Sequence, residues 1–112
     1  MTGAEIVSIE RLLRLYLALP HTPSRASRYD RRLALELRQR QISWEAIETA
    51  LLLAMARRCL RDPSLQPLAP IRSLHYFLPI IEEVLSTEIS PEYVRYLKRK
   101  LAPYLTLCIF SE

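Results

Sequence analysis

The sequence predicts an all-α fold, a compact bundle of about five helices that forms a single helical domain over residues 1–112. Three observations support this prediction. Apolar residues recur at helical spacing, eight prolines separate these segments, and Gly3 is the only glycine. Tight β-hairpins depend on glycine, so all-β and mixed folds are disfavoured. Half of the residues are hydrophobic, which is enough to build a core without metal or disulfide support.

The first two predicted helices are joined by a polar connector. Residues 4–19 place one apolar face at the spacing of a helix, and Pro20 ends that helix because the residue before a proline avoids the helical conformation. Residues 20–27, PHTPSRAS, form the connector. A second helix is predicted from about Arg28 to Arg40, and its narrow apolar side places it on the surface.

The clearest helical segment covers residues 41–63. Ser43 is a suitable N-cap, and residues 50–56 are apolar on all sides, which is typical of a buried central helix. Pro63 ends this segment, and residues 64–70 form a loop punctuated by prolines. A last helix is predicted within residues 87–103, with Ser90 as N-cap and Pro91 at its first position. Residues 104–112 are apolar and are expected to close the core.

Between these elements, residues 71–85 read IRSLHYFLPIIEEVL, an apolar helix with Pro79 at its centre. A proline inside a helix removes one hydrogen bond and clashes with the carbonyl four residues earlier, that of His75, at a cost of about 3 kcal/mol. We therefore expect a kinked core helix, with either a bend near residues 75–78 or two short helices meeting there. In the alternative interpretation, the kink turns His75 and Tyr76 outward as contact residues.

The residues with chemical potential do not form a catalytic motif. His21 and His75 are the only histidines, without the spacing of a zinc site, and Glu82 and Glu83 are interpreted as a solvated pair. Cys59 and Cys108 lack the spacing of a redox motif, so we expect buried thiols in a reducing, cytoplasmic setting, with a disulfide between the two as the alternative. No apolar run approaches the length that spans a bilayer. The sequence predicts no enzyme, no cofactor, no metal and no membrane association.

Positive charge is concentrated in two segments of a chain whose net charge is +4. Residues 20–42 hold six arginines against two acidic residues, and residues 95–100 hold four basic residues. Arginine, which grips phosphates at two points, outnumbers lysine 14 to 2, and neighbouring tyrosines could stack on unpaired bases. The predicted nucleic-acid-binding residues are Arg25, Arg28, Tyr29, Arg31, Arg32, Arg38, Arg40, Arg95, Lys98 and Arg99.

This hypothesis has two further parts and several alternatives. We expect the two basic segments to form one outward surface once the bundle closes, and backbone N–H groups where the second helix begins to add to phosphate attraction. Alternatively, the arginines are ordinary solvated faces, or they meet an acidic protein partner. The chain could also be a protein–protein adaptor that uses Tyr76, Phe77 or residues 104–110, or a homodimer.

Part of the chain resembles a known family. The segments LRQRQISWEAIETALLLAMARR and IRSLHYFLPIIEEVL, within residues 33–85, are similar to the helical module of DnaD-like replication-initiation proteins. The family carries a glycine before the first cap, where this chain has Arg40 and Gln41, and it lacks a proline at position 79. The matching residues are Ser43, Ile47, Ala50, Ala54, Ser73, Tyr76 and Ile80.

The resemblance implies association with DNA, more than with RNA, and with protein partners of a replication assembly. Small helical subunits of CRISPR effector complexes are similar in size and basic character. The leading hypothesis is thus a non-enzymatic accessory module of a replication, recombination or defence assembly that contacts the nucleic-acid backbone. The alternative is an adaptor, or a small subunit of a larger complex, that does not touch nucleic acid.

Overall fold

A computed structural model describes residues 5–105 of the chain, and it confirms the all-α prediction of about five helices. No strand is formed within this range; one isolated β-bridge joins Ile6 to Ser43. The helices, in chain order, are α1 (Ile9–Ala18), α2 (Arg28–Gln39), α3 (Trp44–Cys59), the 3₁₀ helix η1 (Leu74–Phe77), α4 (Leu78–Ser86), α5 (Pro91–Leu101) and the 3₁₀ helix η2 (Ala102–Tyr104).

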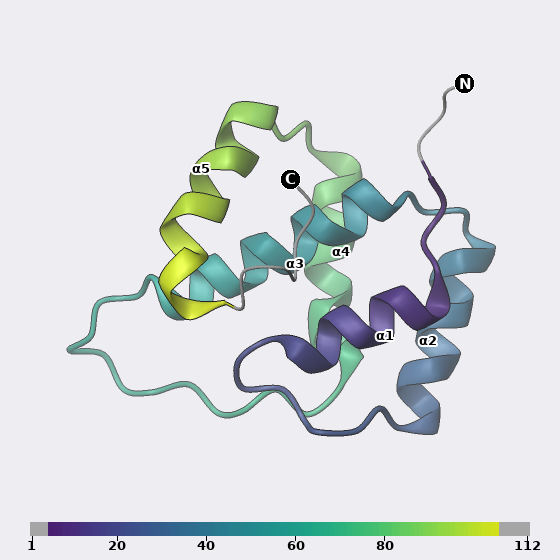
Figure 1. Cartoon of the computed structure of the whole chain (residues 1–112), viewed down its shortest axis with the longest axis horizontal. Helices are drawn as coiled ribbons and strands as arrows, with labels where there is room; N and C mark the ends of the chain where they lie inside the picture. Colours follow the sequence, from purple (N-terminus) through teal and green to yellow (C-terminus); the bar gives the residue numbers. More distant parts are fainter. Residues whose placement is uncertain (1–4, 106–112) are drawn as a thin grey trace.

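The core is built around α3, as its uniformly apolar middle predicts. All side chains from Ala50 to Ala56 are buried, and α4 and α5 both pack against this helix. Helix α1 packs against α2 and crosses it (Figure 1). The rings of Tyr16 on α1 and Phe77 on η1 meet edge to face with centroids 5.9 Å apart, an arrangement that aromatic pairs favour. This contact ties the first helix to the centre of the chain.

The predicted caps of α3 and α5 are confirmed. The Ser43 hydroxyl accepts a hydrogen bond from the Ala46 N–H at 3.1 Å, and the Ser90 hydroxyl accepts one from the Tyr93 N–H at 3.1 Å. Pro91 is the first residue of α5, where its missing N–H costs no hydrogen bond. These local signals therefore fix where both helices begin.

The first helix starts later than its apolar pattern predicts. Residues 5–7 are not helical, because their backbone pairs with the segment before α3: the Val7 N–H donates to the Ile42 carbonyl at 2.9 Å, and the Trp44 N–H donates to the Glu5 carbonyl at 2.6 Å. Ser8 then caps α1. Long-range hydrogen bonds satisfy backbone groups that an extra helical turn would otherwise satisfy.

Pro79 produces a junction between two short helices, the second of the two predicted outcomes. Helix η1 ends at Phe77 and α4 begins at Leu78, so Pro79 lies in the first turn of α4. The Leu78 N–H donates to the His75 carbonyl, which is therefore satisfied. A proline in the first turn removes no helical hydrogen bond; the predicted clash in a continuous helix is avoided because η1 and α4 are separate.

Candidate nucleic-acid interface

The arginines predicted on the second helix lie on a solvent-facing surface. Arg25 lies in the connector and Arg40 is the C-cap residue of α2. We define the α2 surface as Arg28, Tyr29, Arg31, Arg32 and Arg38, all exposed, while Leu33, Ala34 and Leu37 turn into the core. This is the amphipathic arrangement that the sequence predicts.

Ion pairs to neighbouring helices occupy two of these arginines. Arg31 contacts Glu10 of α1 at 3.2 Å. Arg40 makes a two-point contact with Glu82 of α4, with N–O distances of 2.7 and 3.1 Å, and this hydrogen bonding holds the pKa of Glu82 below its usual range. The Glu82 side chain is 49% exposed, in line with the interpretation of a solvated pair, but it also has a specific partner that this interpretation lacked. Glu83 is paired too, with Arg57 of α3 at 2.6 Å.

The start of α2 is already occupied by an acidic side chain of the chain itself. The Asp30 carboxylate accepts the Ser27 N–H at 2.9 Å, while the Ser27 hydroxyl accepts the Asp30 N–H at 3.1 Å. This reciprocal capping box satisfies both N–H groups. Asp30 is also buried. The expectation that N–H groups at this end add to phosphate attraction is thus not supported, because a carboxylate stands there.

The helix α5 presents a more open set of basic and aromatic side chains. Tyr93 and Tyr96 are 44% and 43% exposed, and their rings stack at 5.9 Å with an angle of 20° between planes. Positions 93, 96 and 100 share one side of a helix, so Lys100 continues the tyrosine row. We define the α5 surface as Tyr93, Arg95, Tyr96, Arg99 and Lys100, all exposed.

The charges of the α5 surface are little used by the fold. Arg95 lies 3.8 Å from Glu92 on the same helix, a long contact between two exposed groups. Arg99 and Lys100 make no ion pair within the part of the chain that the structure describes. Lys98, which the sequence grouped with Arg95 and Arg99, is half-buried and lies nearer the core. Tyr93 was not among the predicted residues, although its three-residue spacing from Tyr96 could have identified it.

The two basic surfaces do not join. Figure 1 shows α2 and α5 at opposite ends of the long axis, with α3 between them. The expectation of one combined surface is therefore wrong. It failed because each helix packs independently: α2 packs on α1 and η1, whereas α5 packs on α3.

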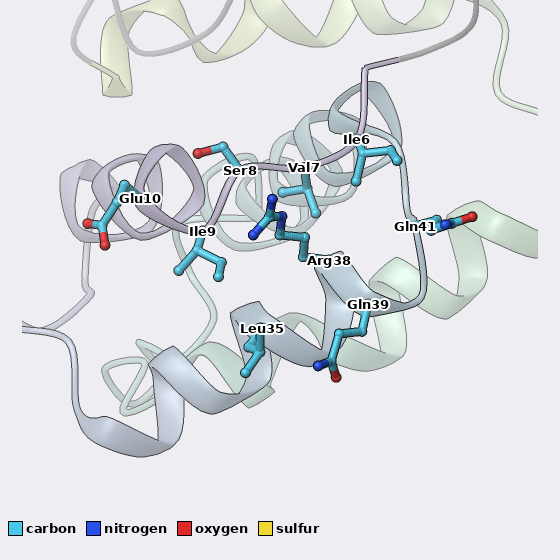
Figure 2. A pocket seen from close by; sticks show the side chains of 9 residues that line it. All are labelled: Ile6, Val7, Ser8, Ile9, Glu10, Leu35, Arg38, Gln39 and Gln41. Atoms are coloured by element: carbon cyan, nitrogen blue, oxygen red, sulfur yellow. The ribbon is translucent and has the colours of Figure 1, made fainter.

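A groove of about 800 Å³ lies where the α2 surface meets the segment before α1. Figure 2 shows its apolar side chains, among them Ile6, Ile9 and Leu35, with Arg38 reaching between the two walls and Gln39 and Gln41 at the α2 end. Ile6 is 45% and Leu35 is 42% exposed. The groove therefore combines accessible apolar walls with a guanidinium of the α2 surface.

The predicted protein interface at Tyr76 and Phe77 is only partly accessible. Phe77 is fully buried and so belongs to the core. Tyr76 is half exposed, and its hydroxyl accepts a hydrogen bond from Arg58 Nη1 at 3.2 Å. The adaptor hypothesis therefore loses Phe77, because the η1 helix turns that ring toward Tyr16. Residues 106–110 of the proposed tail interface, and Cys108, lie outside the described residues.

Groups associated with catalysis are dispersed across residues 5–105. No three His, Cys, Asp or Glu side chains in that range are placed to hold a metal ion. Burial raises the pKa of the Cys59 thiol above its ordinary value, which disfavours a nucleophilic thiolate. None of the described helices is long and apolar enough to cross a membrane. Searches of family models, curated proteins and solved structures give no match to this chain.

Proposed function

We propose that this chain is a non-enzymatic helical module that contacts single-stranded nucleic acid through the α5 surface. The observation that carries the proposal is the exposed, stacked pair of Tyr93 and Tyr96 beside Arg99 and Lys100, whose charges no carboxylate of the described chain neutralises. Proteins that bind single strands without sequence preference combine these two elements, aromatic platforms for bases and a basic track for the backbone.

The tyrosines would supply the contacts to bases. The two exposed rings stack on one another, and an unpaired base can extend or enter the stack. Base stacking on an aromatic side chain contributes about 1–3 kcal/mol per base. Since every base has a π-face, such a surface is tolerant of sequence and requires unstacked bases, which double strands do not offer.

The α2 surface is proposed as a second contact to the phosphate backbone. Arg28 lies over the ring of Tyr29 at 5.1 Å, and Arg32 and Arg38 have no ion pair in the range from residue 5 to residue 105. Arg31 and Arg40 would contribute less, because they are already paired with glutamates. DNA is the favoured polymer, and a replication, recombination or defence assembly the favoured setting, on the resemblance of residues 33–85 to the DnaD-like module.

Fluorescence anisotropy with a labelled oligothymidylate tests this proposal. We expect Tyr93→Ala/Tyr96→Ala to weaken binding by at least tenfold, whereas Tyr93→Phe/Tyr96→Phe should retain most of the affinity because the rings remain. Neutralising two phosphate contacts with Arg99→Gln/Lys100→Gln should lower the slope of log K against log salt by about 1.4, given about 0.7 per contact on a single strand.

The matched control removes the same charge elsewhere. Arg14→Gln/Arg72→Gln replaces two exposed arginines that belong to neither surface, and it should leave the salt slope nearly unchanged. An equal decrease of the salt slope in the control and in the α5 variant would show that binding depends only on net charge. Absence of binding at micromolar protein and low salt would refute the proposal.

The groove beside Arg38 favours a second candidate function, a protein adaptor. Ile6 and Leu35 line the groove of about 800 Å³, a volume large enough for an apolar side chain of a partner, and Arg38 would pair with an acidic residue next to it. A pull-down with nuclease treatment separates the candidates. A partner retained after nuclease and lost with Leu35→Glu would support the adaptor, while a partner lost after nuclease alone would support bridging by nucleic acid.

A further inference from the structure

A second, smaller pocket of about 400 Å³ lies at the C-terminal end of α3. Its walls come from the end of α3, from the loop that connects α3 to η1, from His21 and from Tyr104 of η2. None of the residues of the α2 or α5 surfaces lines it. Its volume lies in the range of sites that hold small molecules.

The pocket contains a buried cation that no described carboxylate neutralises. Arg58 is 8% exposed, and its guanidinium donates from Nη2 to the Ala69 carbonyl at 2.7 Å and from Nη1 to the Tyr76 hydroxyl at 3.2 Å. Nη2 also lies 3.5 Å from His21 Nδ1, and the guanidinium lies over the Tyr76 ring at 5.4 Å. None of these partners is a carboxylate. Its Nε is buried with no hydrogen-bond partner, and no carboxylate in residues 5–105 pairs with it. A buried charge is costly unless an opposite charge compensates it.

A second guanidinium lines the same pocket. Arg61 donates from Nη1 to the Gln66 carbonyl at 2.8 Å, which fixes its position in the loop and leaves Nη2 without a protein partner in the described range. Asp62 is the one carboxylate among the described residues that line the pocket. Its Oδ1 accepts hydrogen bonds from the Ser64 N–H and hydroxyl, both at 2.9 Å. These bonds stabilise the local turn at residues 62–64. The pocket lining thus carries two guanidiniums and one carboxylate, an excess of one positive charge.

Most of the remaining lining is apolar, and His21 and Tyr104 add polar groups to it. Leu65 and Leu68 are exposed large hydrophobic residues of the loop, and Pro63 and Pro67 lie between and beside them in the same lining. Prolines restrict the loop backbone, so a ligand would meet a partly preorganised wall. The pocket therefore has a cationic part at the end of α3 and an apolar part along the loop.

We infer that this pocket binds a small organic monocarboxylate with an apolar tail. The carboxylate would lie against Arg58 and Arg61, since planar guanidiniums match carboxylates in two-point fashion, and the tail would cover Leu65 and Leu68. A single negative charge complements the excess of one positive charge, whereas a dianionic phosphate exceeds it and leaves the apolar wall uncovered. The inference does not depend on nucleic-acid binding, because the two sites share no residue.

Titration of the ¹⁵N-labelled full chain with sodium 4-phenylbutyrate tests the inference. We expect saturable shifts of the backbone amides of residues 58–68 and a rise of the melting temperature, because a ligand that binds only the folded state stabilises it. Two probes separate the parts of the ligand. 4-Phenylbutan-1-ol keeps the tail without the charge, and inorganic phosphate keeps the charge without the tail; each should bind at least tenfold more weakly.

Variants at the pocket mouth avoid the risk of unfolding the core. Arg58→Gln alters a buried residue, so Arg61→Gln and Leu68→Glu are the decisive changes, and each should weaken 4-phenylbutyrate binding by about tenfold or more. Arg72→Gln and Leu85→Glu are the matched controls, since both residues are exposed and lie outside the pocket. Their affinities should equal that of the unmodified chain.

Three results would overturn the inference: no saturable shift with 4-phenylbutyrate, equal affinity for the alcohol, or unchanged affinity in Arg61→Gln. Preferential binding of phosphate would reassign the pocket to a different anion and would equally refute a monocarboxylate site. Oligothymidylate binding by Arg61→Gln should match that of the unmodified chain. The pocket variants therefore test this inference, and the α5 variants separately test the proposed function.

Discussion

At the scale of the residue, Asp30 joins helix α2 to Leu74 of η1, which lies 44 residues later in the chain. One carboxylate oxygen caps α2 through the Ser27 N–H, and the other accepts the buried Leu74 N–H at 2.9 Å. Sequence alone places Asp30 in the first turn of a charged helix, where it looks like one more solvated acid. Its burial follows from the position of η1, which no local pattern in residues 20–40 encodes.

We expect Asp30→Ala to lower the free energy of unfolding by about 3 kcal/mol, because a helix cap is lost and a buried N–H is left without an acceptor. Urea denaturation measures this, with Glu36→Ala on the exposed side of the same helix as control. Burial and the Asp30 charge together raise the pKa of Tyr16 to about 12. The variant should therefore also lower the highest tyrosine pKa in an ultraviolet titration, and equal effects of both variants would contradict the role of Asp30.

Gln41 adopts a backbone conformation that favours glycine, with φ of 61°. It ends α2 in a Schellman motif: the Gln41 N–H donates to the Arg38 carbonyl at 2.9 Å, and the Ile42 N–H donates to the Leu37 carbonyl at 3.3 Å. Glycine is the usual residue at this position because it has no Cβ to clash. The glycine that the DnaD-like pattern carries before its first cap would suit this conformation.

We expect Gln41→Gly to raise the free energy of unfolding by about 1 kcal/mol, since a left-handed conformation costs a residue with a Cβ roughly that amount. Arg32→Gly, at an exposed position within α2, should lower the free energy of unfolding by about 1 kcal/mol. Thermal or urea denaturation of both variants checks the opposite signs. A loss of stability in both would show that the turn does not hold residue 41 in this conformation.

At the scale of the element, α4 shows that the effect of a proline on helix stability depends on its position within the helix. Because Pro79 lies in the first turn, Pro79→Ala should change the free energy of unfolding by less than about 1 kcal/mol. Leu85→Pro, which places a proline near the other end of the same helix, should cost about 3 kcal/mol or more. Denaturant midpoints measure both. A large loss in Pro79→Ala would instead indicate that the junction depends on the ring.

Helix α4 is also fastened by two adjacent glutamates that reach different neighbours. Glu82 pairs with Arg40 after α2, and Glu83 pairs with Arg57 on α3. Hydrogen bonds from these arginines lower the pKa of both carboxyl groups. Such groups bind protons more weakly in the folded state, so their contribution is present above the ordinary glutamate pKa and is lost as pH falls through the lowered values.

We therefore expect Glu82→Gln/Glu83→Gln to flatten the fall in stability below about pH 4.5, the ordinary range of glutamate. Urea midpoints at pH 7 and pH 3 measure this. The control Glu36→Gln/Glu88→Gln changes two exposed glutamates that form no ion pair with the described residues of α2 or α3, and it should keep the original pH dependence. Parallel pH profiles of all three proteins would show that the pairs contribute nothing measurable.

At the scale of the whole molecule, the separation of α2 and α5 sets the length of nucleic acid that can reach both. The molecule extends 44 Å along its longest axis, and one strand of a duplex advances about 3.4 Å per nucleotide. A strand of about 13 nucleotides or more at that spacing can therefore contact both surfaces. A strand of about 6 nucleotides covers about 20 Å at the same spacing, which is less than half of the longest extent.

We expect Arg28→Gln/Arg32→Gln on the α2 surface to weaken binding of a 30-nucleotide strand and to leave binding of a strand of about 6 nucleotides unchanged. The α5 variant Tyr93→Ala/Tyr96→Ala should weaken both. Anisotropy with the two lengths gives the comparison. If the α2 variant weakened short and long strands alike, α2 would be a primary contact and the proposed order of the surfaces would be reversed.

Helix positions and ends were largely predictable, because caps, prolines and apolar periodicity act locally. Ser43 and Ser90 begin helices through their own hydroxyls, and the apolar middle of α3 must be covered by other elements. The candidate site was less predictable. Local pattern identified the arginines of α2 and α5, but it gave neither their ion pairs nor the exposed row that Tyr93 forms with Tyr96.

The sequence by itself determined that the chain is a helical bundle with basic helices, since residue type and spacing decide helix formation and which side of each helix is polar. Only the tertiary structure decided which charges remain available. Whether Arg40 meets Glu82, whether Arg58 is buried, and whether α2 and α5 lie together depend on contacts between residues distant in the chain. Electrostatic energies vary with distance and burial, and packing alone sets both.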